Sequence, residues 1–182
     1  MTIEKFKEDL ANLATDDIVD RWMMTGSCAI VNDATAHAIG SAISAHFHIG
    51  YREIVYVGSA KLGFSIKPSR RYQPFGEDSD VDVAIVSRDL FERVWKEVYV
   101  YDHSGSYWPD KAKFRKYMYR GWIRPDLLPQ SRVFDFSREW WPFFNRVGKS
   151  VCRYKIAAGI YHSEFFLREY QKICVSQCKT ES

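Results

Sequence analysis

The chain has 182 residues, 46% of them hydrophobic, and a formal net charge of +3. This length is typical of one domain with a real apolar core, and the small net charge does not by itself indicate a nucleic-acid-binding protein. No apolar run is long enough to span a bilayer and no leader resembles a signal peptide, so we expect a cytoplasmic protein without a membrane partner. The four cysteines form no Cys-x-x-Cys pair, which favours free thiols.

The first part of the chain is predicted to be helical. Residues 3–13 and 17–24 have the spacing of short amphipathic helices, and Asp16 or Asp17 is a suitable N-cap for the second. A longer helix is predicted over residues 29–47, where apolar side chains recur at helical spacing. The many small residues of that helix indicate close packing against a sheet.

An apolar strand at residues 53–57 runs directly into Gly58 and Ser59. We expect a helix to start at Ser59, so that its free backbone N–H groups and the positive end of its dipole bind an anion. Gly58 lets the backbone approach a phosphate closely, and the Ser59 hydroxyl donates one more hydrogen bond. The pattern therefore predicts a phosphate-binding turn.

A second predicted strand, at residues 81–86, carries a pair of carboxylates. Asp80 and Asp82 point to the same face because strand side chains alternate. Two adjacent carboxylates repel each other, so an apolar strand rarely carries such a pair without a cation. Mg²⁺ suits them, since it takes one or two protein carboxylates together with substrate phosphates. The alternative is a buried strand whose aspartates cap neighbouring backbone, which leaves two like charges unexplained.

The spacer between the turn and the carboxylate pair is basic. It holds Lys61, Lys67, Arg70 and Arg71, with no acid before Glu77. We take Lys67 and Arg70 as candidate ligands of a triphosphate.

Helices and strands alternate through the rest of the chain. In order, we expect a helix capped by Asp89, a loop at 102–109, a basic and aromatic helix or arm at 111–122, strands at 132–136 and 154–160, and a closing helix at 163–175.

The segment at residues 111–124 interleaves basic and aromatic side chains. Cations on phosphates and aromatic faces under bases are typical of a platform for single-stranded nucleic acid. A solvated helix whose aromatic residues pack in the core explains the pattern equally well. The candidate strand-binding or acceptor-binding residues are Lys113, Lys116, Tyr117, Arg120 and Trp122.

The apolar strand, the Gly-Ser turn and the Asp-x-Asp strand together resemble the DNA polymerase β-like nucleotidyltransferase superfamily. The residues that carry the resemblance are Gly58-Ser59-Ala60-Lys61-Leu62-Gly63 and Ser79-Asp80-Val81-Asp82-Val83-Ala84-Ile85. The resemblance implies an α/β (α+β) nucleotidyltransferase fold, a small mixed twisted sheet flanked by helices. Within one domain over residues 1–182, we expect a helical part at 1–50, the catalytic sheet at 51–160 and the closing helix at 161–178.

The resemblance also implies a reaction. An acceptor hydroxyl attacks the α-phosphate of a nucleoside or deoxynucleoside triphosphate, and pyrophosphate is released with two Mg²⁺ ions, or Mn²⁺ in their place. Gly58 and Ser59 hold the β- and γ-phosphates, while Asp80 and Asp82 hold both metals. A third acid is expected on a neighbouring strand, and its best match is Asp135. Asp126 and Asp110 are rivals in loops, and an N-cap of a following helix is the structural alternative for Asp135.

The resemblance to small stand-alone members of this superfamily also implies a macromolecular partner for this chain. They often belong to bacterial anti-phage defence or toxin–antitoxin modules, where they modify an effector, toxin or tRNA or make a nucleotide signal. The basic and aromatic segment favours an oligonucleotide acceptor or product over a small molecule. The competing hypothesis is a catalytically degenerate nucleotidyltransferase fold that acts as a binding module or antitoxin. The intact Asp pair argues against it, and a missing third acid would favour it.

Overall fold

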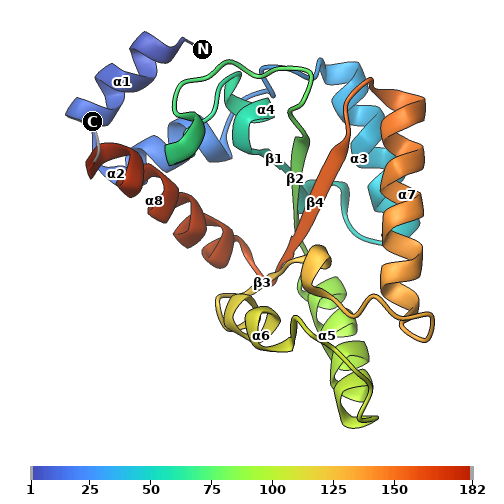
Figure 1. The fold of residues 1–182 in the computed structure, drawn as a ribbon. Coiled ribbons are helices and arrows are strands. Elements are labelled where there is room, and N and C mark those ends of the chain that lie inside the picture. Colours follow the sequence, from blue (N-terminus) through green and yellow to red (C-terminus); the bar gives the residue numbers. More distant parts are fainter. Residues whose placement is uncertain (1, 181–182) are drawn as a thin grey trace.

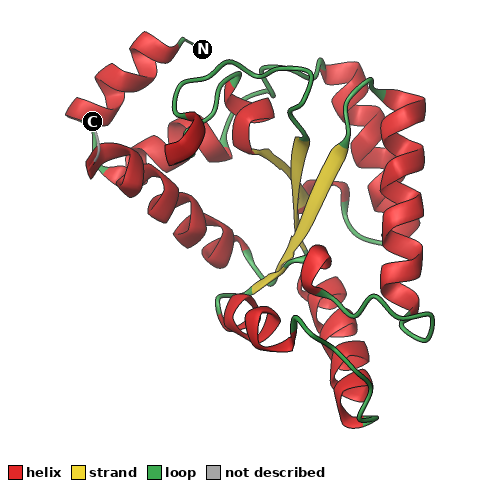
Figure 2. Cartoon of the chain, viewed as in Figure 1, coloured by secondary structure: helices red, strands yellow, loops and turns green. Residues whose placement is uncertain are grey.

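Four strands form one mixed, open sheet in the order β1-β2-β4-β3. The computed structural model describes residues 2–180 and sets the sheet among helices (Figures 1 and 2). Strand β2 pairs antiparallel with β1 and parallel with β4, and β3 pairs antiparallel with β4. The bounds are β1 (Ile54–Val57), β2 (Val81–Val86), β3 (Trp122–Ile123) and β4 (Ile156–Tyr161). The strands predicted at 53–57, 81–86 and 154–160 are confirmed, with boundaries shifted by up to two residues.

Within residues 2–180, eight α-helices flank the sheet. They are α1 (Ile3–Asn12), α2 (Thr15–Ile18), α3 (Asp33–Phe47), α4 (Gly58–Leu62), α5 (Arg88–His103), α6 (Lys111–Tyr119), α7 (Asp135–Val151) and α8 (Glu164–Thr180). A π-helical segment, η1 (Val19–Met24), continues α2, and single 3-10 turns lie at Tyr51–Glu53, Pro68–Arg70 and Pro125–Leu127. No helix among residues 2–180 is both long and apolar enough to cross a lipid bilayer.

One face of the sheet builds the main core. Helices α3, α5 and α7 pack there, and Figure 1 shows α3 and α7 beside the strands. Strand alternation sends Val81, Val83 and Ile85 of β2 to this face, where they are buried with Ile156 and Ile160 of β4. The prediction that these three β2 side chains point into the core is therefore confirmed.

The opposite face is covered more sparsely. Helix α8 crosses it, and η1 and α4 fill the space beside the end of β1. Ion pairs join α8 to the start of the chain, with Lys172 Nζ 2.6 Å from an oxygen of Asp16 and Arg168 bonded to Asp20. The first part of α8 packs on the strands, with Leu167 against Ala84 and Tyr161.

Several predicted helix starts were wrong. Helix α3 begins at Asp33 with Asn32 as N-cap, because Ala29 and Ile30 donate backbone hydrogen bonds to carbonyls of α4 instead. Helix α2 begins at Thr15 with Ala14 at the N-cap position, and no side chain caps it. Helix α5 takes Ser87 as its N-cap rather than Asp89. For α3 and α5, a competing hydrogen bond or cap moved the boundary.

The strand predicted at 132–136 was also wrong. Residues 131–134 form a turn, and Asp135 opens the long helix α7, which contains Pro142. The apolar residues of α7 recur at helical spacing and are buried against α3 and β4, which outweighs the internal proline. Further upstream, the predicted basic arm divides into α6 and the short strand β3.

Gly121 connects α6 to β3 in a backbone conformation with φ +65°. A Cβ at this position would collide with the ring of Phe166 on α8. We predict that Gly121→Ala lowers the free energy of unfolding by roughly 3 kcal/mol or more, since the strained conformation adds to overpacking. Gly105→Ala is the matched control, because Gly105 has φ +73° and nothing within 4 Å of an added Cβ. Denaturant titration that gives equal losses for both variants would contradict the proposed packing of Phe166.

Candidate functional site

Gly58 and Asp82 lie directly against each other. Val57 at the end of β1 pairs with Asp82 on β2, so the residue after Val57 turns over the carboxylate. Gly58 has φ +67°, and an added Cβ would collide with the Asp82 carboxylate. The Gly-Ser turn and the aspartate strand therefore form one site, and only glycine fits where they meet.

The predicted helix after the turn exists but is only five residues long, Gly58–Leu62. So short a helix aligns few peptide dipoles, and its field is weaker than the sequence suggested. Lys61 does not face the site. Its side chain is buried, and its ammonium group donates to the carbonyls of Thr25, Gly26 and Ser27. This lysine therefore holds the segment before α3 in place.

The two aspartates differ in environment. Asp80 precedes β2 and is partly exposed, with an oxygen 3.4 Å from Lys155 Nζ. Asp82 is more enclosed, and burial raises its pKa to about 6, with Asp80 adding to the rise and Lys67 and Lys155 opposing it. The prediction that the pair shares one face with nearby cations fits this arrangement. The cost of the enclosed charge favours a cation beside Asp82.

A cleft of about 450 Å³ opens beside Asp82, between α8 and the sheet, and Asp80 is not among its lining residues. We call it the α8 cleft. Gly58, Ser59, Lys67 and Asp82 line it, and Ala157 and Gly159 of β4 are on the same sheet face as Asp82. These two β4 residues have almost no side chain, and the Trp122 indole packs over Gly159, where an added Cβ would come within 2.7 Å of its nitrogen. A concave site with a few convergent polar groups is typical of a small-molecule pocket.

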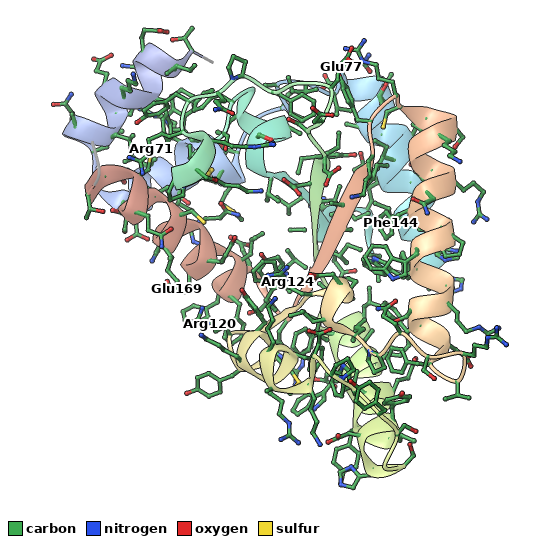
Figure 3. All side chains as sticks on the ribbon, in the orientation of Figure 1. Arg71, Glu77, Arg120, Arg124, Phe144 and Glu169 are labelled. Carbon is green, nitrogen blue, oxygen red and sulfur yellow. The ribbon has the colours of Figure 1, made fainter. Side chains whose placement is uncertain are left out.

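Aromatic rings gather along the cleft on β3, β4 and α8. The rings of Trp122 and Tyr161 are parallel with centroids 5.4 Å apart, and Tyr170 lies 4.6 Å from Trp122. The Arg124 guanidinium sits over the Trp122 ring and bonds both oxygens of Asp126, at 3.1 and 2.7 Å. Figure 3 labels Arg124 between the sheet and α8. The cleft therefore combines planar apolar surfaces with the polar groups at Gly58 and Asp82.

Of the two predicted phosphate-binding cations, only one lies at the cleft. Lys67 lines the α8 cleft and acts on the charge of Asp82. Arg70 is exposed in the 3-10 turn Pro68–Arg70 and is not among the lining residues. Arg124, in contrast, lines the cleft, although no sequence motif singled it out.

Asp135 is not brought to the cleft. It opens α7, which packs on the far face of the sheet, and its side chain is 85% exposed with an oxygen 2.7 Å from Arg138. Its expected place on a strand facing the cleft was therefore wrong, because the apolar neighbours of Asp135 belong to a helix. The rival Asp126 does line the cleft, but Arg124 binds it.

The basic and aromatic segment also splits into two parts. Lys113, Lys116 and Arg120 are exposed, and Figure 3 shows Arg120 on the outer side of the molecule. Tyr117 and Trp122 pack edge to face with centroids 5.2 Å apart. Of the remaining cations, Lys111 and Arg115 are both paired with Asp102. Tyr117 and Trp122 thus pack against each other, Tyr119 is exposed, and part of the positive charge remains solvated.

The residues present fit one Mg²⁺ better than two. Asp80 and Asp82 would supply carboxylate oxygens to one ion, since Mg²⁺ commonly takes one or two protein carboxylates and completes its shell with water and phosphate oxygens. Among the described residues, no group of three or more histidines, cysteines, aspartates and glutamates is arranged to hold a metal. A second ion with a third protein carboxylate therefore lacks its ligand within residues 2–180.

Comparisons with protein-family models, with curated proteins and with solved structures find no match to this chain. The resemblance stated above thus depends on the motif residues alone. Sequence reasoning missed Arg124, Tyr170 and Gln171 as cleft residues. Only their position relative to the sheet reveals them, because α8 has no motif that marks one face for a ligand.

The pKa of Asp82 predicts an unusual stability profile. A folded-state pKa of about 6 lies above the ordinary value of 3.8, so folding penalises the ionised form. That penalty is present above pH 6, shrinks as the pH falls through this window, and is absent below about pH 4. With a chelator present, Asp82→Asn should raise the free energy of unfolding at pH 7.5 by up to about 3 kcal/mol, and much less at pH 4.5.

Urea titrations at the two pH values test this profile. Asp78→Asn is the control, because Asp78 is exposed in the loop before β2. Equal effects of the two substitutions at pH 7.5 would contradict the enclosed environment of Asp82.

Proposed function

We propose that this chain is a Mg²⁺-dependent nucleotidyltransferase that uses a nucleoside triphosphate in the α8 cleft. One observation carries the proposal: the Asp82 carboxylate lies against the positive-φ turn at Gly58, at a cleft lined by Lys67. A carboxylate there repels an anionic ligand unless a cation lies between them. A metal-bound phosphate ligand satisfies the carboxylates, the backbone turn and the lysine together.

Each group has a role in this proposal. Asp80 and Asp82 hold Mg²⁺, which when bound neutralises the phosphates and stabilises the charge that develops on them. Gly58 leaves space for a phosphate beside the backbone, and the Ser59 hydroxyl donates a hydrogen bond to it. Lys67 and Lys155, which already act on the charge of Asp82, balance the remaining negative charge.

The reaction itself is a displacement at the α-phosphate. The acceptor oxygen forms a bond to the α-phosphorus, the bond from that phosphorus to the bridging oxygen breaks, and pyrophosphate leaves with the bonding electrons. The acceptor proton passes to solvent. A cleft that holds the phosphates rigidly lowers the barrier by positioning and by electrostatic stabilisation.

For the acceptor we propose an oligonucleotide, extended or modified within a bacterial defence or toxin–antitoxin module with an effector or toxin as partner. Lys113, Lys116 and Arg120 support it, because they are exposed on one short stretch and can contact phosphates. The packed positions of Tyr117 and Trp122 limit the stacking part of the original hypothesis, since both rings already have aromatic partners.

A second function is favoured by a specific observation. Residues 2–180 bring no third carboxylate to Asp80 and Asp82, and a third acid normally holds the second metal in two-metal transfer. A nucleotide-binding module without turnover, serving as an antitoxin or partner-binding protein, needs only the cleft and one ion. Binding and turnover must therefore be measured separately.

The carboxylate pair gives the first test. Asp80→Asn with Asp82→Asn should abolish transfer of label from an α-labelled triphosphate, because the metal loses both protein ligands. The same variant should remain folded, since two repelling acids disappear. Product formation is followed on gels with each ribonucleotide and deoxynucleotide, with Mg²⁺ or Mn²⁺.

Glu77→Gln together with Asp78→Asn is the matched control, because both side chains are exposed in the preceding loop. Turnover that survives in the Asp80 and Asp82 variant would overturn the catalytic assignment. Metal-dependent nucleotide binding without turnover in the wild type would establish the binding module instead.

The charge on α6 tests the acceptor. Lys113→Glu with Lys116→Glu should weaken strand binding and shorten products, while leaving binding of a single triphosphate unchanged. The salt dependence of strand binding should also flatten, because fewer counterions are released. Fluorescence anisotropy over a salt series measures this, with Lys96→Glu and Lys149→Glu, exposed on α5 and α7, as the control. An unchanged salt slope would mean that these lysines only solvate the helix.

A further inference from the structure

Asp80 lies outside the α8 cleft, with a lysine beside it. The parallel register of β2 and β4 pairs Val81 with Ile156. Asp80 and Lys155 immediately precede these two residues, and the Lys155 ammonium group lies 3.4 Å from an Asp80 oxygen. The Val81 N–H donates to the Lys155 carbonyl at 2.8 Å, which fixes the backbone of this lysine at the start of β4. The strand register therefore places a cation next to the carboxylate pair.

Two lysines act on the carboxylate pair from different positions. Lys67 lines the α8 cleft together with Asp82, whereas Lys155, like Asp80, is not among the lining residues. The charges of both lysines oppose the rise in the pKa of Asp82. Of the two, Lys155 forms the ion pair with Asp80. Lys155 therefore offsets the repulsion between the two acids from outside the cleft.

The ion pair between Lys155 and Asp80 is easily released. The Lys155 side chain is 67% exposed and the Asp80 side chain is 37% exposed. Exposed ion pairs contribute little stability, because water and salt compete for both charges. A divalent cation carries twice the charge of an ammonium group and binds carboxylate oxygens directly. We therefore expect Mg²⁺ to take the place of the lysine.

We propose that Lys155 holds the cation position at Asp80 in the metal-free protein, is displaced by Mg²⁺, and then binds the phosphates that accompany the ion. This inference rests on the proposed function, because it takes Asp80 and Asp82 as the protein ligands of the ion. The long flexible stem of a lysine lets its ammonium group move while the backbone stays fixed. A metal ion repels the ammonium group, and phosphate oxygens supply the negative charge that the lysine has lost. Lys155 thus couples metal binding to phosphate binding.

Two titrations measure the two halves of this inference. Binding of Mn²⁺ alone is followed by the electron paramagnetic resonance signal of the free ion. Binding of tripolyphosphate at saturating Mg²⁺ is followed by calorimetry. Lys155→Met removes the charge and keeps much of the stem. It should bind Mn²⁺ alone about threefold more tightly or better, because a competing cation is gone, and tripolyphosphate about threefold more weakly or worse.

Two further variants keep the result interpretable. Lys155→Arg keeps the charge and should stay close to the wild type in both titrations. Lys149→Met is the matched control for the loss of one positive charge, because Lys149 is exposed on α7. It should leave both affinities unchanged. The gain in Mn²⁺ affinity of Lys155→Met should also shrink as the salt concentration rises, since salt screens exposed charges.

Opposite changes of the two affinities in Lys155→Met are the signature of displacement, because a lysine that only stabilises the fold changes neither. Unchanged or weaker Mn²⁺ binding would overturn the inference. Tighter Mn²⁺ binding with unchanged tripolyphosphate affinity would also overturn it, because the released lysine would then have no phosphate contact. Opposite changes without turnover by the wild type would retain the coupling and reject the transferase. Turnover by the wild type, with both affinities unchanged in Lys155→Met, would reject the coupling and leave the transferase standing.

Discussion

The contact between Gly58 and the Asp82 carboxylate is the constraint on which the site depends. Antiparallel pairing sets Val57 opposite Asp82, so the chain leaving β1 must turn directly over a carboxylate. A left-handed glycine makes that turn possible, and no residue with a Cβ fits there. A backbone turn suited to phosphate and an acid suited to a cation thus share one point. Their closeness follows from strand register, not from the length of the spacer.

The cleft beside this contact exists because side chains are missing from the floor and present at the edges. On the face that Asp82 shares, β4 carries the small residues Ala157 and Gly159, and the Trp122 indole packs over Gly159. Ion pairs of Arg168 and Lys172 with the start of the chain hold α8 beside the strands. The packed aromatic rings of β3 and β4 form the remaining wall of the cleft, and their burial stabilises it. An open volume therefore persists between well-packed elements.

Whether a third carboxylate joins Asp80 and Asp82 decides between a two-metal and a one-metal site. Helix α7 carries Asp135 to the far face of the sheet, where Arg138 binds it. In the proposed site, Asp80 and Asp82 would hold one Mg²⁺, whose other ligands would be phosphate and water oxygens. A transferase of this kind must rely on positioning and charge neutralisation more than on a protein base for the acceptor. The same pair is sufficient for a module that only binds nucleotide, so the balance between enzyme and binding protein depends on turnover.

The local sequence pattern alone was sufficient to predict some of the strands and site residues of this protein. The alternation of Val81, Val83 and Ile85 with Asp82 placed β2, its core face and the carboxylate pair, because alternation is an intrinsic property of strands. The Gly-Ser turn likewise followed from residue chemistry. Tertiary packing decided the rest. Asp135 became helical because its apolar neighbours bury against α3 and β4, and Tyr170, Gln171 and Arg124 met at the cleft because α8 returns across the sheet. Such contacts join residues far apart in sequence, and no local spacing encodes the distance between them.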